Sequence, residues 1–368
     1  MATITKPYAS LSMAEIADLI MASGDAVTFM VEGEMGSGKS SILWDLAKRA
    51  PDHVPCYVEC ACKDVGDVAV PKIKTLDNVV IGDLVTEGEV TRFVPNEEFG
   101  LHLGKKLILM WDELGKAPGA VVNAVSRIIN EGVLGIYKLP EGSRQFATTN
   151  LAVEGVGDKL QAHIRNRMCM VKMRKPTAME WVENYALLAG INRVIIGFAM
   201  EYPQAFESFE NVEDPNSNHY IFHPKAQRRS FVSPRSLAKA SHILNTTEHL
   251  DDSVRVHALM GMVGEAAAMD ILTLVKLDDD LPTWEQVMRD PEGCKVPKSA
   301  AAACMMIQKA CQRIEADTFS LWMTYMDRMS METQALFART IMRGEKRSMA
   351  ITIRAFAEWS ANNQFMFG

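Results

Sequence analysis

The sequence predicts an α/β protein whose first half folds around a five-stranded parallel sheet and whose second half is helical. Five apolar runs occur within the first 175 residues, near 27–32, 55–60, 107–111, 144–149 and 169–173. Segments with helical spacing lie between these runs, and strands that alternate with helices usually form a parallel sheet. From residue 176 onward the apolar residues follow helical spacing, so we expect helices there.

Length and composition are those of an ordinary globular protein with more than one packed unit. The chain has 368 residues, of which 48% are hydrophobic and 23% charged, and it exceeds the size at which one core usually keeps growing. Its longest apolar runs, such as 194–200, are far shorter than a membrane span. The N-terminal stretch has no apolar signal core, so we expect a cytoplasmic protein without membrane contact.

The seven cysteines are an odd number, which argues against a disulfide framework in such a chain. No second Cys/His pair has the spacing of a tetrahedral zinc site. Cys60 and Cys62 alternate along an apparent strand, and we expect both to be buried thiols.

A glycine-rich loop follows the first expected strand and precedes a helix. Residues 31–41 read VEGEMGSGKSS, which contains the full P-loop pattern of glycine, four residues, glycine, lysine and serine. Glycines let successive N–H groups point at phosphate oxygens, the lysine adds a positive charge, and the helix start adds a partial one. We therefore expect ATP to bind at Gly33, Glu34, Met35, Gly36, Ser37, Gly38, Lys39, Ser40 and Ser41.

The third expected strand ends in an acidic pair. LILMW at 107–111 runs into Asp112 and Glu113, at the strand end where ligands of open α/β sheets collect. We expect Asp112 and the hydroxyl of Ser40 to hold Mg²⁺, with Asp112 acting through water. Glu113 is expected to align or activate the water that attacks the terminal phosphate. The adjacent glutamate favours hydrolysis over transfer to a second substrate, so we predict an ATP hydrolase.

Polar residues at further positions are candidates for phosphate contacts. Asn150 follows the fourth strand and is either a residue that orients the same water or a simple turn residue. Arg165 and Arg167 precede the last strand, where arginines could neutralise phosphate charge from outside the subunit. Arg235 lies in the first turn of a helix, where a cation is unfavourable, so its position indicates a nearby anion.

Taken in order, five stretches resemble those of the AAA+ ATPases, and their spacing is most similar to the MoxR-type branch: GEMGSGKS, LILMWDE, ATTN, IRNRM and SPRSL. The resemblance covers about residues 10–290. It implies a P-loop AAA+ core with catalytic roles for Lys39, Glu113 and Asn150. It also implies that Arg167, or else Arg165, acts on the neighbouring subunit's nucleotide, and that Arg235 is a sensor in a helical lid.

We expect a nucleotide-binding α/β domain over 1–175, a helical lid over 176–290 and a C-terminal helical extension over 291–368. Residues 66–95 alternate Val and Ile with polar residues and predict one or two hairpins inserted beside a helix. In the resembled branch such insertions face the centre or rim of a ring. Phe93 and Tyr137 are therefore candidates for substrate contact, with hairpin packing as the alternative for each.

The function expected from these features is that of a ring-forming ATPase, a hexamer, that remodels or matures a partner protein. The resemblance leads us to expect a companion with a von Willebrand factor A domain. A motor or loader on DNA or RNA is the alternative, but the net charge of −7 and the five acids against three bases in residues 66–95 argue against nucleic acid. A nucleotide-gated assembly protein with slow turnover shares every motif.

Overall fold

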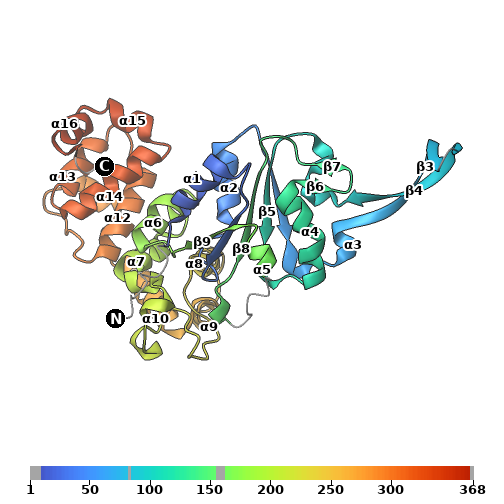
Figure 1. The fold of residues 1–368 in the computed structure, drawn as a ribbon. Helices are drawn as coiled ribbons and strands as arrows, with labels where there is room; N and C mark the ends of the chain where they lie inside the picture. Colours follow the sequence, from blue (N-terminus) through green and yellow to red (C-terminus); the bar gives the residue numbers. More distant parts are fainter. Residues whose placement is uncertain (1–9, 82–83, 155–161, 365–368) are drawn as a thin grey trace, which may run out of the picture. The chain divides into compact units, whose positions relative to one another are not determined.

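The chain divides into two compact units, Met1–Lys175 and Pro176–Gly368. The computed structural model describes residues 10–81, 84–154 and 162–364. Figure 1 shows the sheet in the first unit and the helices of the second. The boundary falls at the expected end of the α/β domain, while the division of the second unit into a lid and an extension stays a prediction.

Five parallel strands form the sheet of the first unit, in the order β2-β5-β8-β1-β9. Their bounds lie within two residues of the five apolar runs: β1 Phe29–Gly33, β2 Val54–Glu59, β5 Leu107–Asp112, β8 Arg144–Thr149 and β9 Cys169–Met173. β1 lies between β8 and β9, so that Met30 pairs with Ala147 on one side and Met170 on the other. This order confirms the expected fold class, a P-loop core of the AAA+ type followed by helices.

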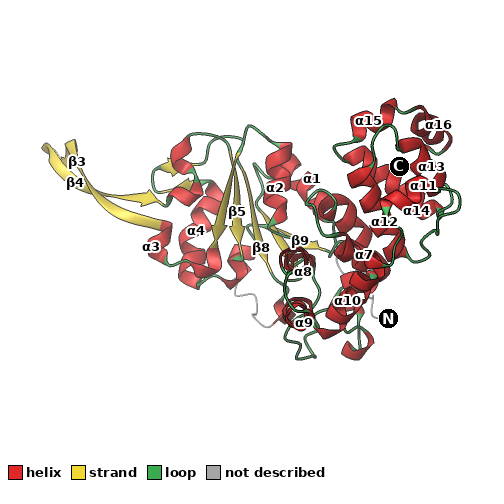
Figure 2. Cartoon of the chain, turned by 180° about the vertical axis from the view of Figure 1, so that it is seen from behind, coloured by secondary structure: helices red, strands yellow, loops and turns green. Residues whose placement is uncertain are grey.

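Helices cover both faces of the sheet (Figure 2). Successive side chains of a strand point to opposite faces. On β5, Ile108 and Met110 pack with α1 (Met13–Ser23) and α2 (Ser41–Arg49). Leu109 and Trp111 pack on the other face, with α4 (Gly119–Glu131). Burial on both faces explains why the inner strands β1 and β5 read as continuous apolar runs rather than as alternating ones.

A long hairpin is inserted between β2 and β5. A 3₁₀ turn at Cys60–Cys62 and the short helix α3 (Val65–Val68) lead into β3 (Ala69–Ile81), which pairs antiparallel with β4 (Leu84–Pro95). The ribbon reaches away from the sheet (Figure 2). A small hairpin follows α4 and consists of β6 (Val133–Leu134) and β7 (Tyr137–Lys138).

The second unit is helical, and its buried faces share one apolar cluster. Its helices are α6 (Ala178–Trp181), α7 (Arg193–Glu201), α8 (Pro234–Thr246), α9 (Asp252–Val263), α10 (Glu265–Asp279), α11 (Trp284–Arg289), α12 (Ala300–Arg313), α13 (Phe319–Met326), α14 (Met331–Arg343), α15 (Arg347–Thr352) and α16 (Arg354–Asn362). Across the described parts of both units, no helix is long and apolar enough to span a bilayer.

Cys60 and Cys62 do not lie on a strand, contrary to the expectation. β2 ends at Glu59, and both cysteines belong to the 3₁₀ turn that follows. With three residues per turn, positions two apart do not share a face. The prediction of a buried thiol is therefore right for Cys60 and wrong for Cys62, which is exposed.

Candidate active site

The glycine-rich loop joins the end of β1 to the start of α2. Gly36 and Gly38 have φ angles of 71° and 101°. These values lie in the left-handed region that side chains with a Cβ rarely adopt, so the loop depends on glycine at both positions. The chain then enters α2 directly after Ser40, as the P-loop pattern requires.

The Lys39 ammonium is buried and lies against the loop that precedes it. Its Nζ donates to the carbonyl oxygens of Gly33 at 2.6 Å and Glu34 at 2.9 Å, and to Oδ1 of Asn150 at 2.8 Å. Asn150 reaches the loop because β8, which it follows, is the direct neighbour of β1. The structure thus brings Lys39 and Asn150 together, although they are 111 residues apart in the chain.

Asp112 ends β5 and is surrounded by three hydroxyl groups. Its Oδ2 accepts from Tyr57 Oη at 2.7 Å and from Ser40 Oγ at 3.3 Å, while its Oδ1 accepts from Thr148 Oγ1. Burial and the Asp112 carboxylate raise the pKa of Tyr57, so this hydroxyl stays protonated and remains a donor. The predicted pair Ser40 and Asp112 is therefore adjacent, at the base of the phosphate loop.

Glu113 adopts the left-handed conformation, with φ of 53°, directly after the strand. Its N–H donates to Thr148 Oγ1 at 3.1 Å, and its carboxylate forms an ion pair with Lys116 Nζ at 2.7 Å. The buried Thr148 hydroxyl thus links the backbone of Glu113 to the side chain of Asp112. Both acidic residues are fixed by the same threonine.

The phosphate loop has the features of a site for an anionic ligand. Ser37 Oγ is buried and has no hydrogen-bond partner. A buried hydroxyl without a partner is uncommon, and a phosphate oxygen would satisfy it. The Glu34 carboxylate instead pairs with Lys175 at 3.5 Å, so Glu34 would offer a ligand its backbone rather than its charge.

The residues around Asp112 fit a magnesium ion. Hydroxyl and carboxylate oxygens are ligands that Mg²⁺ prefers, and this ion usually completes its shell with waters and substrate phosphates. In the described residues no group of three or more His, Cys, Asp or Glu side chains could hold a metal by itself. The site would thus hold the ion together with the nucleotide.

Arg167 and Arg165 lie at the amino ends of the parallel strands, whereas the phosphate loop lies at their carboxyl ends. α5 (Ala162–Arg165) precedes β9, and Cys169 at the start of β9 pairs with Phe29 at the start of β1. The loop follows the other end of β1, a strand of five residues that spans about 16 Å at roughly 3.3 Å per residue. Both arginine side chains are exposed. They are therefore not brought to the phosphate loop of their own chain.

Arg235 lies in the first turn of α8, in the second unit, and its side chain is exposed. The helix begins with a capping box between Ser233 and Ser236, with Pro234 at its first position. The predicted helix start is therefore present, while the sensor role of Arg235 stays a prediction.

Four residues at the site were not expected from the sequence: Tyr57, Lys116, Thr148 and Glu154. Glu154 accepts the N–H of Met35, within the phosphate loop, on both carboxylate oxygens at 3.0 and 3.1 Å. Thr148 belongs to the quoted ATTN stretch and lies at a buried position of β8. The others belong to no motif.

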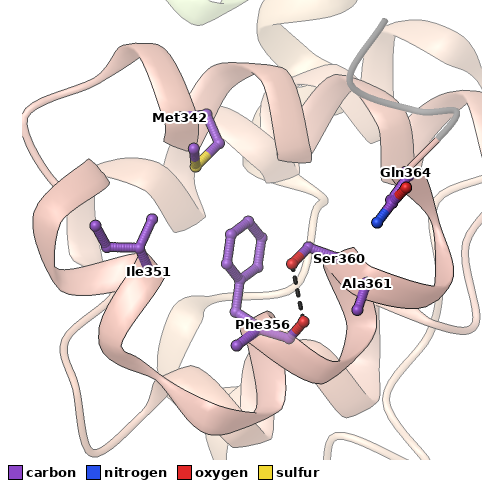
Figure 3. A pocket seen from close by; sticks show the side chains of 7 residues that line it. Met342, Ile351, Phe356, Ser360, Ala361 and Gln364 are labelled. Atoms are coloured by element: carbon purple, nitrogen blue, oxygen red, sulfur yellow. Dashed lines mark hydrogen bonds between the residues drawn. The ribbon is translucent and has the colours of Figure 1, made fainter.

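A hollow of about 530 Å³ lies among the last helices of the second unit (Figure 3). Its walls are mainly apolar, and the Ser360 hydroxyl is engaged with the carbonyl of Ala357 at 2.9 Å. The lining residues are Met342, Ile351, Phe356, Ala357, Ser360, Ala361 and Gln364. None of these described lining residues is charged.

The strand order and the phosphate loop define a P-loop α/β protein with an AAA+ type of core. No protein-family model and no curated protein matches the chain. Among solved structures, Thermotoga maritima RuvB, described as a Holliday junction branch migration motor, aligns with 84% of this chain and 83% of its own, at 12% identity and a TM-score of 0.37.

NtrX from Brucella abortus, in complex with ADP, aligns with 99% of this chain and 69% of its own, at 13% identity and a TM-score of 0.32. An MCM homolog from Methanopyrus kandleri aligns with 71% of this chain and 53% of its own, at 15% identity and a TM-score of 0.28. All three scores are low, so the fold assignment rests on the chain's own strand order and motifs.

Proposed function

We propose that this chain is a cytoplasmic, ring-forming AAA+ ATPase of the MoxR-type branch that couples ATP binding and hydrolysis to the remodelling or maturation of a partner protein. The observation that carries the proposal is the arrangement at the phosphate loop. Lys39 contacts Asn150, which follows the neighbouring strand β8, and Ser40 contacts Asp112 at the end of β5, one strand farther away. A site that only binds phosphate, without hydrolysing ATP, would need neither contact.

The residues have distinct tasks in hydrolysis. Lys39 would exchange the carbonyls of Gly33 and Glu34 for phosphate oxygens. Ser40 and Asp112 would hold Mg²⁺, which would neutralise phosphate charge. Glu113 leaves its ion pair with Lys116, orients the attacking water and accepts its proton on a carboxylate oxygen. Asn150 positions the same water or the terminal phosphate.

The ring is supported by the position of the arginines. Arg165 and Arg167 lie at the amino ends of the strands, away from the phosphate loop of their own chain. They are therefore suited to contact a nucleotide that an adjacent subunit holds. Arg167 is the preferred finger, since it is closer to β9. A hexamer is the expected closed ring, and Arg235 is the expected lid sensor.

The β3–β4 hairpin is the part of the first unit best suited to meet a partner protein. On one face Pro71 lies opposite Phe93, with Ile73 two residues along β3. Ile73 and Phe93 are 73% and 51% exposed, which is unusual for large apolar side chains and suits contact with a polypeptide. Phe93 is therefore a better substrate candidate than Tyr137, whose side chain is only partly exposed. A protein with a von Willebrand factor A domain is the expected companion.

A motor on DNA or RNA is the second candidate, because the bases of the hairpin share one face. Lys72 lies directly opposite Arg92, and Lys74 follows two residues along β3. The count of five acids against three bases does not capture this separation. Phe93 lies on the other face, so the basic face lacks the aromatic stacking that single-stranded binding sites use, as far as the described side chains show. We therefore favour a protein partner.

The test compares two substitutions in the site. Lys39→Ala removes a contact to phosphate charge, so nucleotide affinity should fall strongly, whereas Glu113→Gln should retain affinity and lose turnover by about a hundredfold or more. Nucleotide binding and steady-state phosphate release are measured on both variants. Equal losses of affinity would contradict these roles. The Glu113→Gln protein with ATP would then serve to capture the partner.

A further inference from the structure

Glu154 places a negative charge on the phosphate loop. It ends the 3₁₀ turn Ala152–Glu154, four residues after Asn150, and both of its carboxylate oxygens accept the N–H of Met35. Met35 lies in the first half of the loop, before Gly36 turns the backbone toward α2. An N–H group of this loop is thus occupied by a side chain of the same protein.

Charges of both signs surround the Glu154 carboxyl. Burial, and to a smaller extent the charge of Glu34, raise its pKa, while the N–H of Met35 and the charges of Lys39 and Lys116 oppose that rise. Lys39 is the lysine of the phosphate loop, and Lys116 pairs with Glu113. Glu154 therefore lies on the phosphate loop at the N–H of Met35, where the charge of the phosphate-loop lysine reaches it.

A second observation shows that Glu154 does not complete the loop. Ser37 Oγ, two residues after Met35, is buried without a hydrogen-bond partner. A buried donor of this kind costs free energy unless a ligand satisfies it. The carboxylate accordingly occupies only part of the space that a nucleotide would use.

We propose that Glu154 is an internal substitute for the terminal phosphate of ATP, which holds the loop until that phosphate displaces it. The inference rests on the proposed nucleotide-binding function. A terminal phosphate brings negative charge against this carboxylate and needs the same N–H group, so Glu154 opposes ATP. ADP lacks that phosphate and leaves the contact in place. Glu154 thereby sets the relative affinity of the chain for ATP and ADP.

The test is Glu154→Gln, in which the amide oxygen still accepts the N–H of Met35 but the charge is gone. Binding of ADP and of a non-hydrolysable ATP analogue is measured by calorimetry in the presence of Mg²⁺. The analogue should bind about tenfold more tightly to the variant, which corresponds to the difference between a charged and a neutral hydrogen bond. The affinity for ADP should change by less than about twofold. Glu154→Ala should shift the ratio in the same direction.

The matched control is Glu141→Gln, which makes the same charge change at an exposed position of the same unit. It should leave both affinities unchanged. A ratio of affinities that is the same in wild type and Glu154→Gln, with both proteins folded and binding ADP, overturns the inference. Tighter ADP binding to the same extent as the analogue also overturns it. Failure of the wild type to bind either nucleotide would instead contradict the proposed function.

Discussion

Replacing Thr148 with valine should disturb the positions of Asp112 and Glu113 while leaving both carboxylates in the chain. The Thr148 hydroxyl donates to Asp112 Oδ1 and accepts the N–H of Glu113 at 3.1 Å, and its side chain is fully buried. Valine has nearly the same shape, so the change removes the hydroxyl without leaving a cavity. Asp112 keeps its bonds from Tyr57 and Ser40, whereas the N–H of Glu113 loses the acceptor seen here.

The magnitude follows from these two losses. A hydrogen bond to a charged group contributes roughly 1.5–3 kcal/mol, and a buried N–H left without an acceptor costs about 1–3 kcal/mol. With partial relaxation we expect the sheet to lose about 2–4 kcal/mol of opening free energy. The turnover number should fall by about tenfold or more, since Glu113 and Asp112 lose their common anchor. Nucleotide affinity should change little, because the loop itself is untouched.

Hydrogen exchange at the amides of β5 and β8 measures this opening free energy locally, independently of the second unit. Thr149→Val is the matched control. Thr149 is also buried, but its hydroxyl makes only a long bond, 3.5 Å, to the carbonyl of Asn150. This control should lose less than about 1 kcal/mol. Equal losses in the two variants, or an unchanged turnover in Thr148→Val, would refute the bridging role of Thr148.

Two further predictions concern the assembly and its target. Mixing Arg167→Ala with Lys39→Ala subunits should restore part of the ATP hydrolysis that each variant lacks alone, because an intact phosphate loop then meets an intact Arg167 of the neighbouring subunit. Mixtures as inactive as both parents would exclude action of Arg167 across subunits. DNA and RNA, titrated at low salt where electrostatic binding is strongest, should leave the ATPase rate within about twofold. A large, salt-sensitive stimulation, abolished by Lys72→Glu with Lys74→Glu, would instead favour the motor.

The sheet could be predicted because the inner strands β1 and β5 are largely apolar runs, which is typical of strands covered on both faces. The phosphate loop and the acidic pair could be predicted because their residue types are tied to a fixed spacing. Asn150 was left with two interpretations, and its contact with Lys39 depends on the order of β8 and β1, which no local pattern determines.

Tyr57, Thr148 and Glu154 could not be predicted for the same physical reason. Each is a single side chain whose partner lies 36 to 119 residues away, and single residues of these types are common in any chain. Cys62 was assigned to a strand because a period of two continues past Glu59, whereas the chain turns there. Periodicity does not show where a strand ends.

The β3–β4 hairpin is long enough to convert a small rotation at its base into a larger displacement at its far end. β3 has 13 residues, so at roughly 3.3 Å per residue it extends about 43 Å. The hairpin begins ten residues after Glu59, the last residue of β2, the strand that carries Tyr57 to Asp112. A tilt of about 5° at its base would move its tip by about 4 Å over that length. A small rearrangement at the carboxyl ends of the strands would thus reach a bound molecule as a displacement the size of an atom or more.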